Sequence, residues 1–330
     1  MLASSELSND RIVSQTIAGI PVAFYRDAEQ HPTALLDICP HRGAKLSLGR
    51  VHENVVTCPF HGWQFDKSGT TVRVPWNPDA RRQHLRATSF PVREIAGQVW
   101  IYTGIKAATE PSVHDVFLQP DVRLCGFSME MDTHWTRVME NMLDWPHLPF
   151  VHQRSIGKDL VRKAENGRMD IKLEETSWGF SSRIWIDGEE QPGSLDYRFP
   201  NIMNLFIPIP SKTLVMQVAC VPVTDTRTRL VMTTGRSFAK LGILDRFFNR
   251  ENRKIAMEDR AVVESSYPVE VPRASDERSV RTDAPTLYFR QRYFSELREC
   301  DTHSTGSILG LPCPLRDSED SEITKPLPGA

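Results

Sequence analysis

The sequence has little of several features that would place a protein in a specialised class. Six cysteines in 330 residues are too few for a disulfide scaffold, so paired cysteines and histidines are better explained as metal ligands. A net charge of −2, with both signs mixed throughout, gives no electrostatic basis for binding nucleic acid or an anionic membrane surface. No apolar run approaches a membrane span, and the first residues lack the basic and apolar regions of a secretory signal. We therefore expect a cytoplasmic protein of two domains.

The stretch 140–152 combines two histidines, a carboxylate and a carboxamide within an otherwise apolar run. Polar groups cost free energy in apolar surroundings unless they are paired, so His147, His152 and Asp144 need a reason to be there. Two histidines and one carboxylate form the iron(II) triad that leaves coordination positions open for oxygen. The stretch therefore predicts an iron site whose third ligand lies elsewhere. Taken alone, the H-x4-H pattern is equally explained by two capping or core histidines.

The spacing of the two histidines requires a bend in the chain. On a straight helix His147 and His152 would lie about 140° apart and could not reach one ion. Pro149 lies between them, and proline inside a helix removes a hydrogen bond, so we expect a kinked helix at this residue. Asp144 precedes His147 by three residues, a helical neighbour spacing that places its carboxylate to orient the imidazole.

Two loops in the first hundred residues each carry one cysteine and one histidine. They read Cys39-Pro-His41 and Cys58-Pro-Phe-His61, and sixteen residues separate His41 from Cys58. Four such side chains could form a structural zinc site. Zinc fingers, however, usually place two cysteines in one knuckle and two histidines in the other. A mixed pair in each loop is similar to a Rieske [2Fe–2S] domain, in which histidines replace cysteines on one iron.

The sequence patterns of the two loops indicate which Rieske proteins this chain resembles. The C-P-H-R-G and C-P-x-H-G-W patterns resemble the Rieske domains of ring-hydroxylating oxygenases and their ferredoxins. Respiratory-chain Rieske proteins carry an extra cysteine in each loop, and those positions are Ala44 and Phe60 in this sequence. Short β-rich runs at 17–25 and 33–36, a hairpin around 67–69 and two final strands around Ala96-Gly97 predict a small all-β domain over residues 1–105.

The remaining sequence predicts a sheet followed by a long helix. Four β-rich runs, at 169–173, 179–186, 213–222 and 229–234, suggest antiparallel strands. A helical pattern then runs over 244–267 and is ended by Pro268. We expect residues 106–315 to form the second domain and residues 316–330 to be a disordered acidic tail.

The predicted helix over 244–267 offers a candidate third ligand. Asp259 follows helical spacing with Ile255 and Val262, so it falls on a largely apolar face. Glu258 and Arg260 are expected to point elsewhere. An ion pair with an arginine explains a lone aspartate on such a face as well as metal ligation does.

When a Rieske-like domain precedes it, the N-x2-D-x2-H-x4-H pattern is a stronger indication of a metal site. The combination resembles the oxygenase component (α subunit) of Rieske non-haem iron oxygenases, especially the homotrimeric monooxygenase and demethylase branch that acts on substrates such as vanillate and dicamba. The resemblance implies an α+β protein, with the Rieske domain followed by an antiparallel sheet covered by helices, of helix-grip (START-like) type. It also implies a [2Fe–2S] cluster held by Cys39, His41, Cys58 and His61, and a mononuclear Fe(II) held by His147, His152 and Asp259.

The resemblance assigns roles to two further residues of the stretch 140–152. In a head-to-tail homotrimer, Asp144 would bridge His61 of one subunit and His147 of its neighbour, so that electrons cross the subunit interface. Asn141 would lie near the iron, outside its coordination shell, with a helix-end cap as the alternative. Electrons would come from NAD(P)H through a flavin reductase, a ferredoxin or both.

The activity implied is hydroxylation or oxidative dealkylation of a small molecule by O2. The same metal sites could instead perform desaturation or oxidative cyclisation, and a Rieske electron-transfer protein without a second iron is the alternative from another class. The candidate wall residues of the substrate site favour an apolar, aromatic or polycyclic molecule, although such residues are more often ordinary core. They are Met203, Leu205, Phe206, Ile207 and Met216.

Overall fold

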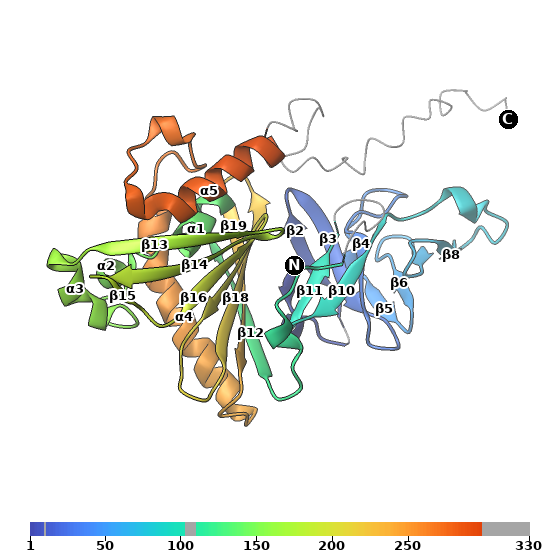
Figure 1. The fold of residues 1–330 in the computed structure, drawn as a ribbon. Helices are drawn as coiled ribbons and strands as arrows, with labels where there is room; N and C mark the ends of the chain where they lie inside the picture. Colours follow the sequence, from blue (N-terminus) through green and yellow to red (C-terminus); the bar gives the residue numbers. More distant parts are fainter. Residues whose placement is uncertain (10, 103–109, 299–330) are drawn as a thin grey trace.

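The structure, a computed structural model, describes residues 1–9, 11–102 and 110–298. An N-terminal all-β domain lies beside a C-terminal domain built on one large sheet (Figure 1). The predicted boundary at residue 105 and the predicted tail over 316–330 fall outside the described residues and stay predictions. Within the described ranges, none of the helices has the length and apolar character needed to cross a membrane.

Three small antiparallel sheets form the N-terminal domain. One contains β2 (Val13–Ile17), β3 (Ile20–Arg26), β4 (Pro32–Leu36) and β9 (Ser89–Phe90), and the second contains β5 (Arg50–His52), β6 (Val55–Thr57), β7 (Gln64–Phe65) and β8 (Thr71–Arg73). The third contains β1 (Leu2–Ala3), β10 (Val92–Ile95) and β11 (Gln98–Ile101). Short 3-10 turns at Ser4–Glu6, Leu46–Leu48 and Arg82–His84 connect these strands.

Both hairpins expected in this domain are confirmed. The β10–β11 hairpin turns through Ala96 and Gly97, whose φ angles of 55° and 71° fit the tight turn that matches strand twist. The β7–β8 hairpin turns at Gly69, which has a φ of 79°. An added Cβ at Gly69 would lie 1.9 Å from the carbonyl oxygen of Ala87, so this position requires glycine.

The C-terminal domain is organised around an eight-stranded antiparallel sheet. Its strand order is β12-β19-β18-β17-β16-β14-β13, with β15 paired to β14. The strands are β12 (Arg123–Met131), β13 (Met169–Thr176), β14 (Gly179–Ile186), β15 (Glu189–Glu190), β16 (Ser194–Arg198), β17 (Ile202–Phe206), β18 (Leu214–Thr224) and β19 (Arg227–Arg236). The four β-rich runs predicted from the sequence correspond to β13, β14, β18 and β19.

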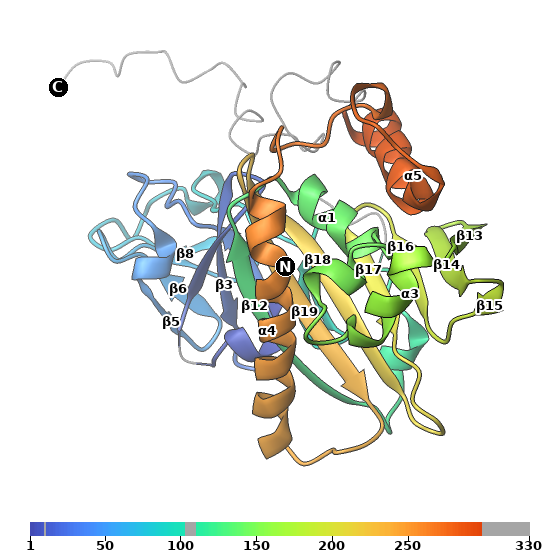
Figure 2. The ribbon, with the colours of Figure 1, turned by 90° about the vertical axis from the view of Figure 1, so that its left-hand side faces the viewer.

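The helices of this domain gather on one face of the sheet (Figure 2). They are α1 (Trp135–Leu143), α2 (Leu148–Val151), α3 (Val161–Asn166), α4 (Ile243–Glu264) and α5 (Ala284–Arg292), which continues as a π-helical turn over Tyr293–Arg298. Further 3-10 turns span Asp115–Leu118, Lys158–Leu160, Ala274–Asp276 and Arg281–Asp283. The helix expected over 244–267 is α4, which ends before the predicted stop at Pro268.

The sheet separates two cores because side chains alternate along each strand. On β18, Met216 and Val218 pack with α1, α4 and α5, whereas Ala219 and Val221 pack with Leu2 and other residues of the N-terminal domain. A buried hydrogen bond of 3.1 Å from Gln217 Nε2 to Gln98 Oε1 also joins the sheet to β11. The helix-covered face and the face that contacts the N-terminal domain are therefore distinct.

The predicted kink at Pro149 is wrong. The helical path breaks earlier, because Asp144 is the extended C-cap of α1, with a ψ of 116°. Pro149 lies in the first turn of α2, where the missing N–H needs no partner within the helix. The bend that the two histidines require is therefore made by the loop between α1 and α2.

Candidate metal centres

The two Cys/His loops of the N-terminal domain share one backbone design. In each loop the cysteine N–H donates to the carbonyl oxygen five residues later, at 2.8 Å from Ala44 and 2.8 Å from Trp63. A glycine then donates back to the cysteine carbonyl, and these glycines, Gly43 and Gly62, have φ angles of 71° and 70°. Only glycine adopts this conformation at low cost, so each loop closes tightly around its cysteine.

The two loops bring their histidines together and bury their cysteines. Cys39 and Cys58 are each 2% exposed, and the rings of His41 and His61 lie 4.6 Å apart between centroids. Burial raises the pKa of the Cys39 thiol to about 11, so the thiolate forms only where a cation compensates it. His41 stacks on Trp63 at 4.5 Å, and its buried Nδ1 has no hydrogen-bond partner within the described chain. Two thiols and two imidazoles with these properties fit a Rieske cluster.

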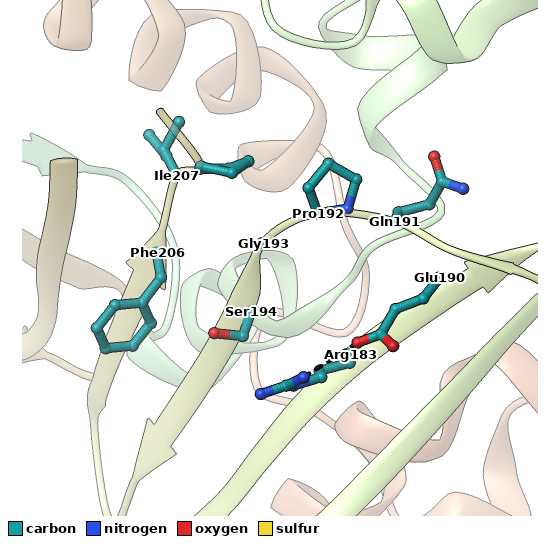
Figure 3. A pocket seen from close by; sticks show the side chains of 9 residues that line it. Arg183, Glu190, Gln191, Pro192, Gly193, Ser194, Phe206 and Ile207 are labelled. Atoms are coloured by element: carbon teal, nitrogen blue, oxygen red, sulfur yellow. Dashed lines mark hydrogen bonds and ion pairs between the residues drawn. The ribbon is translucent and has the colours of Figure 1, made fainter. Parts of the chain in front are cut away.

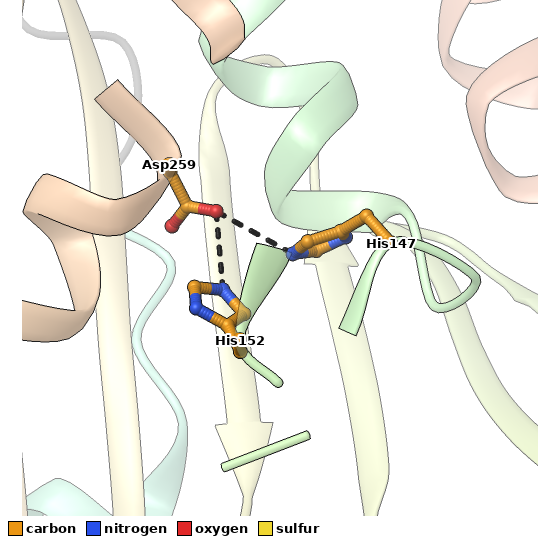
Figure 4. A group of neighbouring side chains, drawn as sticks. All are labelled: His147, His152 and Asp259. Carbon is orange, nitrogen blue, oxygen red and sulfur yellow. Dashed lines mark ion pairs between the residues drawn. The ribbon is translucent and has the colours of Figure 1, made fainter. Parts of the chain in front are cut away.

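The second candidate centre lies between α2 and α4 (Figure 4). His147 is the N-cap of α2 and His152 is its C-cap, so one short turn places their rings 5.2 Å apart between centroids. Asp259 comes from α4, and its Oδ1 lies 3.5 Å from Nε2 of His147 and 3.1 Å from Nε2 of His152. The three ligand atoms lie within 4.8 Å of one another.

The burial of this group favours a metal ion between its members. Asp259 is 3% exposed and His152 is 2% exposed, yet Oδ1 of Asp259 has no hydrogen-bond partner among the described residues. A carboxylate buried this deeply is costly unless positive charge lies beside it, and two imidazole nitrogens and a carboxylate oxygen are ligands that suit iron(II). The donor set therefore fits the predicted mononuclear metal.

The two imidazoles of this centre differ in their electrostatic surroundings. Burial lowers the pKa of His147, and the Asp259 carboxylate offsets this only in part. Burial also lowers the pKa of His152, but the carboxylates of Asp259 and Glu258 outweigh it, so the pKa of His152 is raised. His152 thus stands between two carboxylates, one at each ring nitrogen.

Glu258 contradicts the expectation that it points away from the site. Its Oε2 lies 2.7 Å from Nδ1 of His152 and accepts a hydrogen bond of 2.7 Å from the hydroxyl of Ser155. The helical spacing placed Glu258 one residue off the apolar face, but the longer glutamate side chain reaches around α4 to the turn after His152. Sequence reasoning missed this contact, although the general rule that ligating histidines bond a carboxylate through the other nitrogen pointed to it.

Asp144 and Asn141 lie at the end of α1, next to His147. Oδ2 of Asp144 is 3.8 Å from Nδ1 of His147, which is ion-pair range rather than a hydrogen bond. Asp144 is only partly buried, and the loss of solvent around its carboxyl, helped by the nearby carboxylates of Asp283 and Glu140, raises its pKa to about 7. Asn141 lies in the last turn of α1, and its buried Nδ2 has no partner within the described ranges.

The candidate wall residues divide between the two faces of the sheet. Met203 and Met216 are buried in the helix-covered core, and Leu205 and Ile207 pack against it. Phe206 points to the opposite face, where it packs with Val215 and contacts the His114 ring at 4.8 Å. A pocket lined by Phe206, Ile207, Arg183 and Glu190 lies at the end of the β16–β17 pair and does not include the metal-binding group (Figure 3).

His31 forms a further carboxylate and imidazole group with Asp27 and Glu29. This group was not expected from the sequence. Asp27 is 2% exposed, accepts from the His31 N–H at 2.8 Å and pairs with the Lys67 ammonium at 3.2 Å. The lysine already supplies a positive charge, so the group is explained by turn geometry and an ion pair.

A Rieske domain is joined here to an antiparallel sheet whose covering helices hold two histidines and an aspartate, and this is the architecture of the oxygenase components of Rieske non-haem iron enzymes. Residues 1–91 match the Rieske [2Fe-2S] domain, and residues 131–298 match the vanillate O-demethylase oxygenase C-terminal domain. The second match covers just over half of the 330 residues, and the chain belongs to this family.

Individual proteins with similar sequences include the oxygenase components of two O-demethylases. The chain is 33% identical over 166 residues to the oxygenase component of dicamba O-demethylase from Stenotrophomonas maltophilia, covering 49% of each chain. It is 32% identical over 146 residues to the vanillate O-demethylase oxygenase subunit of a Pseudomonas species, covering 43% of this chain and 44% of the relative. The matched stretches thus span about half the length of these relatives.

Solved structures show the same fold across almost the whole chain. The crystal structure of dicamba monooxygenase bound to dicamba superimposes with a TM-score of 0.77 at 22% identity, covering 92% of this chain and 96% of the other. NdmA from Pseudomonas putida CBB5 superimposes with a TM-score of 0.74 at 23% identity, covering 92% and 90%. At these identities the likeness concerns the fold, and it confirms the predicted order of an all-β Rieske domain and a helix-covered antiparallel sheet.

Proposed function

We propose that this protein is the oxygenase component of a Rieske non-haem iron monooxygenase. In this proposal it uses O2, together with electrons from NAD(P)H delivered by a partner reductase or ferredoxin, to hydroxylate or oxidatively dealkylate a small apolar molecule. The observation that carries the proposal is the convergence of His147, His152 and Asp259, from two elements far apart in the sequence, with two imidazole nitrogens facing one buried carboxylate oxygen. A cytoplasmic location stays a prediction from the sequence.

The residues of the two candidate centres would hold different metal groups. Cys39, His41, Cys58 and His61 would hold the [2Fe–2S] cluster, and His147, His152 and Asp259 would hold Fe(II). The mononuclear iron, when bound, would supply O2 activation at coordination positions that the three protein ligands leave open. The protein side chains hold the ligand atoms in place and keep them away from bulk water, since His152 and Asp259 are almost fully buried.

The positions of the two centres support a homotrimer in which the cluster of one subunit delivers electrons to the iron of its neighbour. The strands next to the Cys/His loops and α2, which His147 and His152 cap, lie on opposite sides of the molecule (Figure 1). His61 is exposed and the Asp144 side chain retains 34% of its exposure, so both are reachable from outside. In a head-to-tail trimer, Asp144 would link His147 to His61 of a neighbouring copy and provide the path for electrons. Asn141 would lie beside the iron without ligating it.

The substrate is proposed to be apolar, with an aromatic ring. Met203, Leu205, Ile207 and Met216 face the helix-covered core that also contains α1, and they would favour such a molecule. Relatives bear names that refer to dicamba, vanillate and chloroacetanilide, all of which are aromatic compounds. Desaturation and oxidative cyclisation need the same ligand set, so they remain alternatives at this site.

Iron and acid-labile sulfide per chain test the proposal directly. On anaerobically purified protein we expect about three irons and two sulfides in the wild type. Asp259→Ala should fall to about two irons with sulfide unchanged, because only the mononuclear ligand set is broken. Glu251→Ala, on the same helix with 36% of its side chain exposed, is the matched control and should keep the wild-type values. Two irons in all three proteins would refute the oxygenase proposal and favour an electron carrier.

A further inference from the structure

Glu258 joins the candidate iron ligand His152 to the turn that follows it. One carboxylate oxygen, Oε2, lies 2.7 Å from Nδ1 of the imidazole and 2.7 Å from the hydroxyl oxygen of Ser155. Both distances are typical of strong hydrogen bonds to a charged acceptor. Glu258 keeps 32% of its side-chain exposure, whereas the imidazole keeps 2%, so the carboxylate reaches inward from a partly solvated position.

The turn after His152 is closed so that Ser155 faces the same carboxylate. The carbonyl oxygen of His152 accepts from the N–H groups of Ser155 at 2.9 Å and Gly157 at 3.0 Å. A Cβ added at Gly157 would lie 1.9 Å from the carbonyl oxygen of Leu148, so the turn is tight enough to require glycine. The backbone therefore fixes where the serine hydroxyl lies.

These contacts determine which nitrogen of His152 is free to bind a metal. A carboxylate at Nδ1 makes that nitrogen the N–H donor, and the lone pair then lies on Nε2. Nε2 is the atom that faces Asp259 at 3.1 Å. Because Glu258 and Asp259 are consecutive residues of α4, the orienting carboxylate and the ligand carboxylate are positioned by one helical turn.

We propose that Glu258 is a positioning residue for the mononuclear metal and that Ser155 acts through it. Glu258 holds the imidazole of His152 in the tautomer and orientation that present Nε2 to the iron, and it increases the basicity of that ligand. Ser155 holds the carboxylate in place from its other side. The inference rests on the proposed function, since it assumes that His152 ligates iron.

The test measures Fe(II) affinity rather than turnover. Full-length protein that retains its [2Fe–2S] cluster is stripped of mononuclear iron and titrated anaerobically with Fe(II) in equilibrium dialysis. Glu258→Ala should raise the Kd for Fe(II) by about 10-fold to 100-fold, the usual effect of losing such a partner. Ser155→Ala should raise it by less, and should add nothing in the Glu258→Ala background. Glu251→Ala on the same helix should match wild type.

A spectroscopic readout separates positioning from a loss of folding. Glu258→Gln keeps the size of the side chain but removes its charge, so the cluster absorbance and Tm should stay close to wild type. At saturating Fe(II), the EPR spectrum of the nitric oxide adduct should differ from wild type in this variant, because the imidazole orientation changes. A purely structural role would leave that spectrum unchanged in iron-loaded protein.

The outcomes distinguish the inference from the function on which it rests. Equal Fe(II) Kd values and equal spectra in wild type, Glu258→Ala and Glu258→Gln, with the iron lost in Asp259→Ala, would overturn the inference alone. A wild-type protein that binds no iron beyond its cluster would overturn the proposed function and the inference with it. A raised Kd confined to the Glu258 and Ser155 variants, with non-additive effects in the double variant, supports the inference.

Discussion

Replacing Glu140 with glutamine should destabilise the C-terminal domain strongly. Glu140 on α1 contacts two arginines, with its Oε2 at 3.2 Å from Nη1 of Arg137 and at 3.1 Å from Nη2 of Arg290 on α5. Both arginines also bond Glu277, in the chain between α4 and α5. Two positive and two negative groups therefore form a compact, nearly neutral cluster that attaches α5 to α1.

The burial of this cluster sets the size of the effect. The side chains of Arg137 and Arg290 are each 8% exposed and that of Glu140 is 12% exposed. Removing one partner of a buried ion pair leaves an uncompensated charge and costs about 3–5 kcal/mol, whereas an exposed pair contributes about 0–1 kcal/mol. Arg183 and Glu190 form such an exposed pair, with 63% and 47% exposure. Glu190→Gln is therefore the matched control.

Thermal unfolding monitored by circular dichroism at neutral pH provides the measurement. A loss of 3 kcal/mol in a domain of this size lowers Tm by at least about 6 °C, and the control should change it by about 4 °C or less. Because Glu140 precedes Asn141 and lies one helical turn before Asp144, the variant should also lose part of its mononuclear iron. If Glu140→Gln lowered Tm no more than Glu190→Gln, the reasoning from burial would be refuted.

Two more outcomes follow from the geometry of the same domain. Gly157→Ala should lower Tm and weaken Fe(II) binding, because its Cβ would overlap the carbonyl of Leu148 and force apart the turn that holds His152; an iron content equal to wild type would count against this. Burial raises the pKa of Glu277, but Arg137 and Arg290 outweigh it and hold the pKa below its ordinary value of 4.5. The stabilisation is therefore present above about pH 4.5 and is lost as the pH falls through the lower folded-state pKa. The Tm difference between wild type and Glu277→Gln should accordingly narrow below pH 4.5, and a constant difference down to about pH 3.5 would contradict the assignment.

Much of the fold could be predicted because local patterns and the architecture agree. Short sequences that permit few backbone conformations determine three of these elements. They are the turn at Ala96-Gly97, the pair of Cys/His loops and α4. Helical spacing placed Asp259 on the apolar face of α4, and the resemblance to a family placed it with His147 and His152; the roles of these residues as ligands stay a proposal.

The expectations that failed depended on contacts between distant segments. Helical spacing gave the direction in which the Glu258 backbone position faces, but not the reach of a long side chain toward a turn from another part of the chain. Pro149 was expected to bend a helix, yet the chain had already left the helix at Asp144. The sequence pattern also placed Phe206 with its neighbours, although a strand sends adjacent side chains to opposite faces.

The alternation along β17 also bears on how new specificities could arise. Met203 and Leu205 face the helix-covered core, while Ile202, Asn204 and Phe206 face the other way. If the proposed substrate site is correct, substitutions at the first set would change the surroundings of the substrate and leave the contact with the Rieske domain untouched. A mutant library restricted to Met203 and Leu205 could therefore change substrate specificity without weakening the contact with the Rieske domain. Because adjacent residues of β17 face opposite sides of the sheet, substrate specificity and the packing of the two domains can be changed independently.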